Sequence, residues 1–104
     1  MAPTDRATKS ASATNTGAAT DKALVAAVTG KRIHIKKLVF TSSAATDLTI
    51  ESDGTSSDTQ IIKLLGVTAV VLEGFEFLKT LVGEALIYTT TAGNSEVYVE
   101  YNEG

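Results

Sequence analysis

The sequence has no cysteine and no tryptophan, and Pro3 is the one proline among its 104 residues. Without cysteine the chain can form no disulfide, no thiolate metal site and no thiol nucleophile. No apolar run reaches the roughly 18 residues that a membrane-spanning helix needs, and the N-terminus lacks the apolar stretch of a secretory signal. We therefore expect neither a disulfide-stapled fold nor a membrane partner.

Signatures of catalysis are equally scarce. His34 is the single histidine, and a catalytic triad or a histidine metal site would need converging partners that no spacing in the sequence provides. Gly-rich phosphate loops and the Gly-x-Ser-x-Gly pattern are absent. We expect no enzyme activity, no catalytic residues and no cofactor.

One group of carboxylates invites a metal interpretation. Asp47, Glu51, Asp53 and Asp58 flank the turn-rich segment 52–57, and clustered carboxylates on a loop can bind Ca²⁺. Their spacing differs from that of an EF-hand, however, and the turn chemistry of Ser, Asp and Gly explains the segment without an ion. We therefore predict no metal site.

The chain is rich in residues that favour strands. Thr, Val and Ile supply 31 of its residues, and these types suit pleated, half-buried surfaces. Short runs with period-2 alternation, separated by turn signals, indicate strands in a single domain. The expected strands span residues 22–28, 31–41, 47–52, 58–65, 67–78, 84–91 and 95–102, the last two joined by a hairpin turn at 92–94. This spacing predicts an all-β fold, an antiparallel β-sandwich of jelly-roll type.

The alternation also predicts which side chains are buried. Ile33 and Ile35 alternate with basic residues, whereas Leu38 and Phe40 continue the pattern one residue out of phase. The Lys36-Lys37 pair is therefore predicted to form a β-bulge. The predicted core comprises Ile33, Ile35, Leu48, Ile50, Leu86, Val97 and Val99.

The first residues differ in composition from the rest. Thirteen of the first twenty are Ala, Ser or Thr, and none is Leu, Ile, Val or aromatic. Such a segment buries too little apolar surface to offset an ordering cost of roughly 1–2 kcal/mol per residue. We predict an extended N-terminal arm over residues 1–21, beside a domain over 22–104. Arg6 and Lys9 would let the arm bind an acidic partner; the alternative is a passive leader.

Charge is unevenly placed along the chain. Residues 1–40 carry seven Lys or Arg and two Asp, which gives +5, and residues 41–104 carry two Lys and ten Asp or Glu, which gives −8. Arg32, His34 and Lys36 form a basic stripe that we predict to meet acidic groups, either Glu96 and Glu100 of a paired strand or a neighbouring subunit. Nucleic acid is not expected as a partner, because the chain is acidic overall and no aromatic residues interleave with the stripe.

Three stretches resemble a known class of proteins. Leu-Val-Ala-Ala-Val-Thr-Gly-Lys-Arg-Ile at 24–33 precedes a strand, Gly-Glu-Ala-Leu at 83–86 leads into Thr-Thr-Thr at 89–91, and the chain closes with Val-Tyr-Val-Glu-Tyr at 97–101. This order resembles small virion proteins of tailed bacteriophages, in particular capsid decoration (cement) proteins. The resemblance implies a jelly-roll-like domain on the outer surface of the capsid, often a homotrimer, with the major capsid protein as its partner.

The resemblance leaves one alternative open. Tail-fibre and spike modules use similar sandwiches, and such a module would bind a receptor or a carbohydrate. That function would need exposed aromatic residues around a groove, and Tyr98 is the one aromatic that the strand pattern places on an exposed face.

Overall fold

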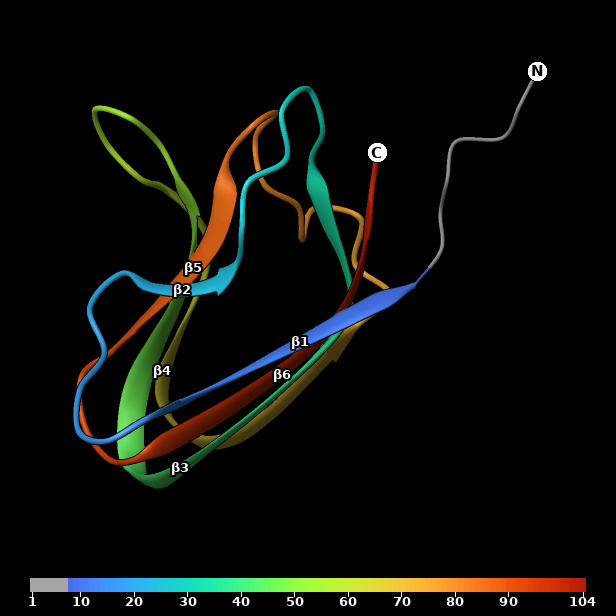
Figure 1. Ribbon diagram of the computed structural model, residues 1–104. Helices are drawn as coiled ribbons and strands as arrows, with labels where there is room; N and C mark the ends of the chain where they lie inside the picture. Colours follow the sequence, from blue (N-terminus) through green and yellow to red (C-terminus); the bar gives the residue numbers. More distant parts are fainter. Residues whose placement is uncertain (1–7) are drawn as a thin grey trace.

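The computed structural model describes residues 8–104, which form strands and no helix (Figure 1). In chain order the strands are β1 (Lys9–Asn15), β2 (Lys22–Val25), β3 (Ile33–Asp53), β4 (Thr59–Glu73), β5 (Ala85–Thr90) and β6 (Ser95–Glu103). Every recorded pairing is antiparallel. The predicted all-β, antiparallel class is thus confirmed. Over these residues no helix is long and apolar enough to cross a membrane.

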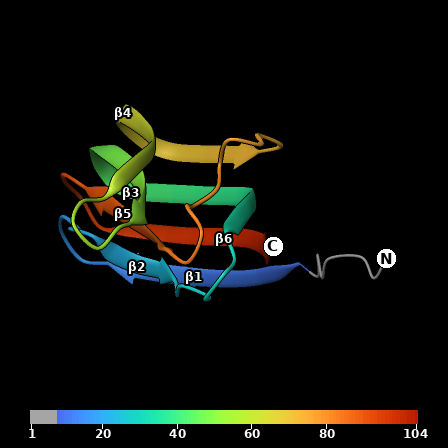
Figure 2. The same ribbon diagram turned by 90° about the horizontal axis from the view of Figure 1, so that it is seen from above.

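The strands belong to one sheet that curls toward a barrel. Its order is β1-β6-β3-β5-β2, and β4 pairs with β3 as well. Figure 2 shows β4, β3, β6 and β1 side by side in that order. β1 and β2, at the two ends of the path, approach each other. A jelly-roll sandwich of two sheets is not confirmed by this pairing.

The curvature comes from β3, which changes partner along its length. Residues 33–42 pair with β6, residues 48–53 pair with β5, and the register against β4 shifts between Thr41 and Thr46. The sequence predicted two strands here, because the run of small residues at 42–45, Ser-Ser-Ala-Ala, has no apolar alternation. Those residues form a bulge within one strand, and a bulge bends a strand without ending it.

β4 is likewise one strand where the sequence predicted two. The expected break at Gly66 is an irregularity at which the glycine adopts φ 63° and its N–H donates to Asp47 Oδ1 at 3.0 Å. Pairing with β3 continues on both sides. The strand ends at Glu73, before the end predicted at residue 78.

The core lies inside the curled sheet, between the part in which β3 pairs with β6 and the part in which β3 pairs with β5. All seven predicted core residues are buried, and they form one cluster with Leu38, Phe40, Leu78 and Tyr88. The predicted bulge at Lys36 is also confirmed, because the register between β3 and β6 shifts between Ile35 and Lys37. The shift returns Leu38 and Phe40 to the same face as the two isoleucines.

The N-terminal segment takes part in this sheet. β1 pairs with β6 in register from Lys9 to Asn15, and Ala11 and Ala13 pack against the core. Ala19 is 3% exposed, and its N–H donates to Thr90 Oγ1 at 2.9 Å. The sheet therefore extends across the boundary predicted at residue 22. Alanine buries little area, but it is enough for a strand whose backbone pairs with an existing sheet edge.

β5 and β6 do not form the predicted hairpin. They follow each other in sequence, but β3 lies between them in the sheet. The connecting segment instead packs on the bulge of β3: Ser43 N–H donates to the Asn94 carbonyl at 2.9 Å, and Asn94 N–H donates to Ser43 Oγ at 2.8 Å. The turn signal at 92–94 was real, but it marks a crossing between the two arms of the sheet.

Gly93 in this crossing has no room for a side chain. A Cβ added there would lie 2.5 Å from Ser42 Oγ and 2.9 Å from Ala44 N, and the residue has φ 78°. Gly30 has φ 76° with nothing within 4 Å. The strain of a left-handed alanine should therefore lower the free energy of unfolding of Gly30→Ala by roughly 1–2 kcal/mol. In Gly93→Ala the clash should lower it by about 1–3 kcal/mol more. Urea denaturation of both variants checks this, and equal losses would contradict the crowding.

Candidate subunit-binding site

The segment between β4 and β5 holds a pair of exposed aromatic rings. Phe75 is 48% exposed and Phe77 is 53% exposed, and their ring centroids lie 5.5 Å apart. Leu81 and Val82, further along the segment, are exposed as well. Large apolar side chains gathered in water are typical of surfaces that another molecule covers.

These rings are held in place by the backbone that follows them. Leu78 is buried, and its carbonyl accepts a hydrogen bond from Ile35 N–H at 2.8 Å. Thr80 is buried too: its N–H donates to the Ile33 carbonyl at 3.0 Å, and its Oγ1 accepts from Ile33 N–H at 2.9 Å. Because alternate residues of an extended segment point to opposite sides, burying 78 and 80 turns Phe77 and Lys79 outward.

A cleft of about 540 Å³ opens beside the aromatic pair. The start of β3 supplies one wall and the segment after β4 supplies the other, while β6 contributes Asn102; the lining residues are His34, Ile35, Lys36, Gly74, Phe75, Glu76, Leu78, Lys79 and Asn102. Basic side chains outnumber the one carboxylate. The cleft therefore combines an apolar wall with cationic groups.

Two of the predicted partner-binding residues lie in this cleft. His34 is half-buried, with Nε2 3.4 Å from the Gly104 carbonyl, and Lys36 is exposed, with Nζ 3.5 Å from Thr8 Oγ1. Arg32 stands next to them in sequence, and its backbone N–H donates to the Gly104 carbonyl at 3.0 Å. His34 and Lys36 of the predicted stripe thus line the cleft together with Lys79.

Of the other two predicted residues, the structure describes Lys9. Lys9 is at the start of β1 and forms an ion pair with Glu103, Nζ to Oε1 2.9 Å. Arg6 lies outside the described residues. Lys9 is not among the residues that line the cleft.

The predicted meeting of the stripe with Glu96 and Glu100 is not seen in the register of β3 and β6. Glu96 lies opposite Thr41, and Glu100 lies opposite Lys37 because the bulge displaces Lys36. Among residues 8–104 the recorded ion pair is Lys9–Glu103. The other form of the prediction, acidic groups on a neighbouring subunit, stays a prediction.

Sequence reasoning missed the aromatic pair and Lys79. It extended a strand through residue 78 and so treated Phe75 and Phe77 as ordinary strand residues. The usable signal was Gly74, which adopts φ 78° and follows the last residue of β4. The strand ends directly before Gly74, and the apolar residues after it belong to a connecting segment.

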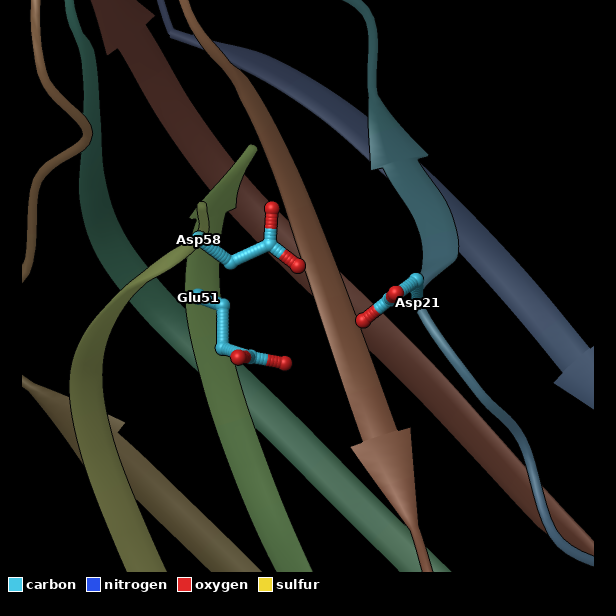
Figure 3. Close-up of side chains that lie close together, drawn as sticks. All are labelled: Asp21, Glu51 and Asp58. Carbon is cyan, nitrogen blue, oxygen red and sulfur yellow. The ribbon is translucent and has the colours of Figure 1, made fainter. Parts of the chain in front are cut away.

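A second group of residues gathers three carboxylates. Asp21 precedes β2, Glu51 is on β3 and Asp58 precedes β4, and their side chains point toward one another (Figure 3). Carboxylate oxygens of all three lie within 4.8 Å of one another. Of the acidic residues singled out in the sequence, this group includes Glu51 and Asp58. Asp47 instead accepts a hydrogen bond from Gly66.

Within this acidic group, the carboxyl of Glu51 has a shifted pKa. Burial raises the pKa of its carboxyl above the ordinary value, and the charges of Asp21 and Asp58 raise it further, while a hydrogen bond from the Thr89 hydroxyl opposes both effects. The Thr89 Oγ1 lies 3.2 Å from Glu51 Oε1 and 3.4 Å from Asp21 Oδ1, and its hydrogen can serve one of them at a time. Carboxylate oxygens at this spacing can hold a hard cation between them.

Comparison of the chain with known protein families and with curated proteins finds no match. The resemblance to phage virion proteins therefore depends on the motifs in the sequence alone.

The raised pKa of Glu51 predicts a pH dependence of stability. The folded state binds this proton more tightly than the unfolded state does, so the unfavourable contribution is present at neutral pH and disappears as pH falls through the folded pKa toward the ordinary value. Glu51→Gln should therefore raise the melting temperature at pH 7 and lose that advantage at acidic pH. Glu96→Gln, at an exposed position on β6, is the control. A Glu51→Gln protein no more stable than wild type at pH 7 would contradict this account.

Proposed function

We propose that the protein is a structural protein that binds other protein subunits through the cleft beside Phe75. In the form that the sequence resemblance implies, it is a virion protein on the outer surface of a capsid, where it cements neighbouring copies of the major capsid protein. One observation carries the proposal: Phe75, whose ring contacts that of the exposed Phe77, lines one open cleft together with three basic side chains.

The chemistry of the cleft suits a protein segment. Aromatic side chains are enriched at the centres of protein interfaces, where their burial supplies much of the binding free energy. Phe75 brings such a side chain to a wall shared with Leu78. The ammonium groups of Lys36 and Lys79 favour carboxylates on the partner, and the His34 ring can hydrogen-bond to them. The expected partner segment is apolar with flanking Asp or Glu.

The placement of the cleft also changes which part of the chain would attach. The sequence pointed to the N-terminal arm, but β1 is engaged with β6 and Lys9 is paired with Glu103. The cleft has the exposed apolar surface that β1 lacks. In this proposal Arg6 is a further contact of the same partner, and no nucleic acid or membrane takes part.

The test is binding of variants to purified capsids that lack this protein. Phe75→Ser with Phe77→Ser should weaken binding at least about tenfold, because an interface aromatic typically contributes 1–2 kcal/mol or more and 1.4 kcal/mol is a factor of ten. Both rings are exposed, so the fold should be unaffected. Tyr98→Ser is the matched control, since Tyr98 is an exposed aromatic on β6 away from the cleft. Cosedimentation measures the affinity.

Three outcomes separate the possibilities. Weaker binding by the double variant alone supports the cleft. Equal binding by all three proteins rejects the cleft as the contact. Failure of the wild-type protein to bind any capsid, together with binding to a glycan that the double variant loses, would favour the fibre or spike module.

A further inference from the structure

β4 is an open edge of the sheet. It pairs with β3 from Thr59 to Glu73, and over residues 8–104 no strand pairs with its other side. The strand is fifteen residues long, whereas natural edge strands are usually short or covered, because free N–H and C=O groups recruit further strands. An uncovered edge of this length is a surface in need of a partner.

The outward side chains of β4 have a definite pattern. Lys63 and Glu73 are exposed at the two ends, and between them Leu65 is 69% exposed and Val71 is 60% exposed. The inward side chains of the strand pack against the core; they include Ile62, Leu64, Val70 and Leu72. Along the strand these outward side chains are therefore a cation, two apolar residues and an anion. A second copy that runs in the opposite direction would set its anion opposite the cation and its apolar residues opposite the apolar ones.

One antiparallel register satisfies this row completely. If Thr68 of one copy lies opposite Thr68 of a second copy, Lys63 lies opposite Glu73 and Leu65 opposite Val71, and each pair occurs twice. A shift by two residues in one direction sets Lys63 against Val71, and a shift in the other direction sets Leu65 against Glu73. A shift by one residue would place inward side chains opposite outward ones.

We propose that β4 is a self-association edge: two copies of this chain join β4 to β4 antiparallel, about a two-fold axis at Thr68. Such an interface is isologous, so each favourable contact is made twice. Opposite-charge and apolar cross-strand pairs contribute roughly 0.2–1 kcal/mol each. The irregularity at Gly66 lies close to the axis, two residues from Thr68 in each copy.

This inference is independent of the proposed function, because it needs no capsid and no residue of the cleft. It also departs from the homotrimer that the resemblance implies. A closed trimer would have to join β4 to a different strand of the next copy, whereas the row of side chains on β4 fits β4 itself.

The register can be tested by cross-linking, because the chain has no cysteine of its own. Thr68→Cys places one thiol of each copy at the axis, where facing Cα atoms about 4.5–5.5 Å apart fall within the range of about 4.4–6.8 Å that a disulfide spans. Thr59→Cys is the control, since in this register the two thiols would lie about 60 Å apart. Both threonines are exposed. Under mild oxidation Thr68→Cys should form disulfide-linked dimers rapidly, and Thr59→Cys should not.

Charge exchange gives a second readout. Lys63→Glu should weaken self-association about tenfold at low ionic strength, and adding Glu73→Lys should restore it, because the swapped charges again face each other. Within one chain Glu73 lies opposite Lys37, so urea denaturation of each variant must show an intact fold. Sedimentation equilibrium should give wild type a mass of twice 10.8 kDa.

Each contrary result overturns the inference. A wild-type protein that stays monomeric at high concentration rules out the pairing. A trimer rules out the two-fold axis. Equal cross-linking of Thr68→Cys and Thr59→Cys, or a folded double charge variant that fails to reassociate, rules out the register.

Discussion

β3 pairs with β6 along its first half and with β5 along its second half, and the change of partner occurs at the bulge of residues 42–45. Ladder hydrogen bonds lost at this bend are replaced by side-chain hydroxyls: Thr91 and Ala92 donate their N–H groups to Thr46 Oγ1 at 2.8 and 3.1 Å. The bend folds one sheet over a single core. It also explains why the segment between β5 and β6 crosses over β3.

The same strand sets the position of the cleft. The backbone N–H of Ile35 donates to the Leu78 carbonyl, and the Ile33 carbonyl accepts from Thr80 N–H. These hydrogen bonds bring the segment after β4 alongside His34 and Lys36. Aromatic and basic groups that are about forty residues apart in the chain thereby become neighbours. The cleft is a consequence of how β3 begins, and its composition follows from which side chains that backbone pairing leaves outside.

Alternation of apolar residues was sufficient to predict the core and the bulge at Lys36, because burial of a strand face leaves a period of two that a one-residue slip would destroy. The choice of which strands pair with each other leaves no such pattern in the sequence. Pairing of β1 depends on backbone groups that every residue carries, so its alanines gave no sign of it, and turn residues at 92–94 serve a crossing as well as a hairpin. Asp21 joined Glu51 and Asp58 only through the fold, since β2 approaches β3 by way of β5.

The order of strands in the sheet has a consequence for how the chain folds. β3 and β4 are the one pair of sheet neighbours that also follow each other in sequence. β1 is synthesised before the other five strands, yet its partner β6 comes after them. A growing chain can therefore form the β3–β4 ribbon early, while β1 waits until β6 has left the ribosome. Pairings between such distant segments are slow to form, on the order of milliseconds to seconds, so pairing of β1 with β6 is a late step in the folding of this sheet.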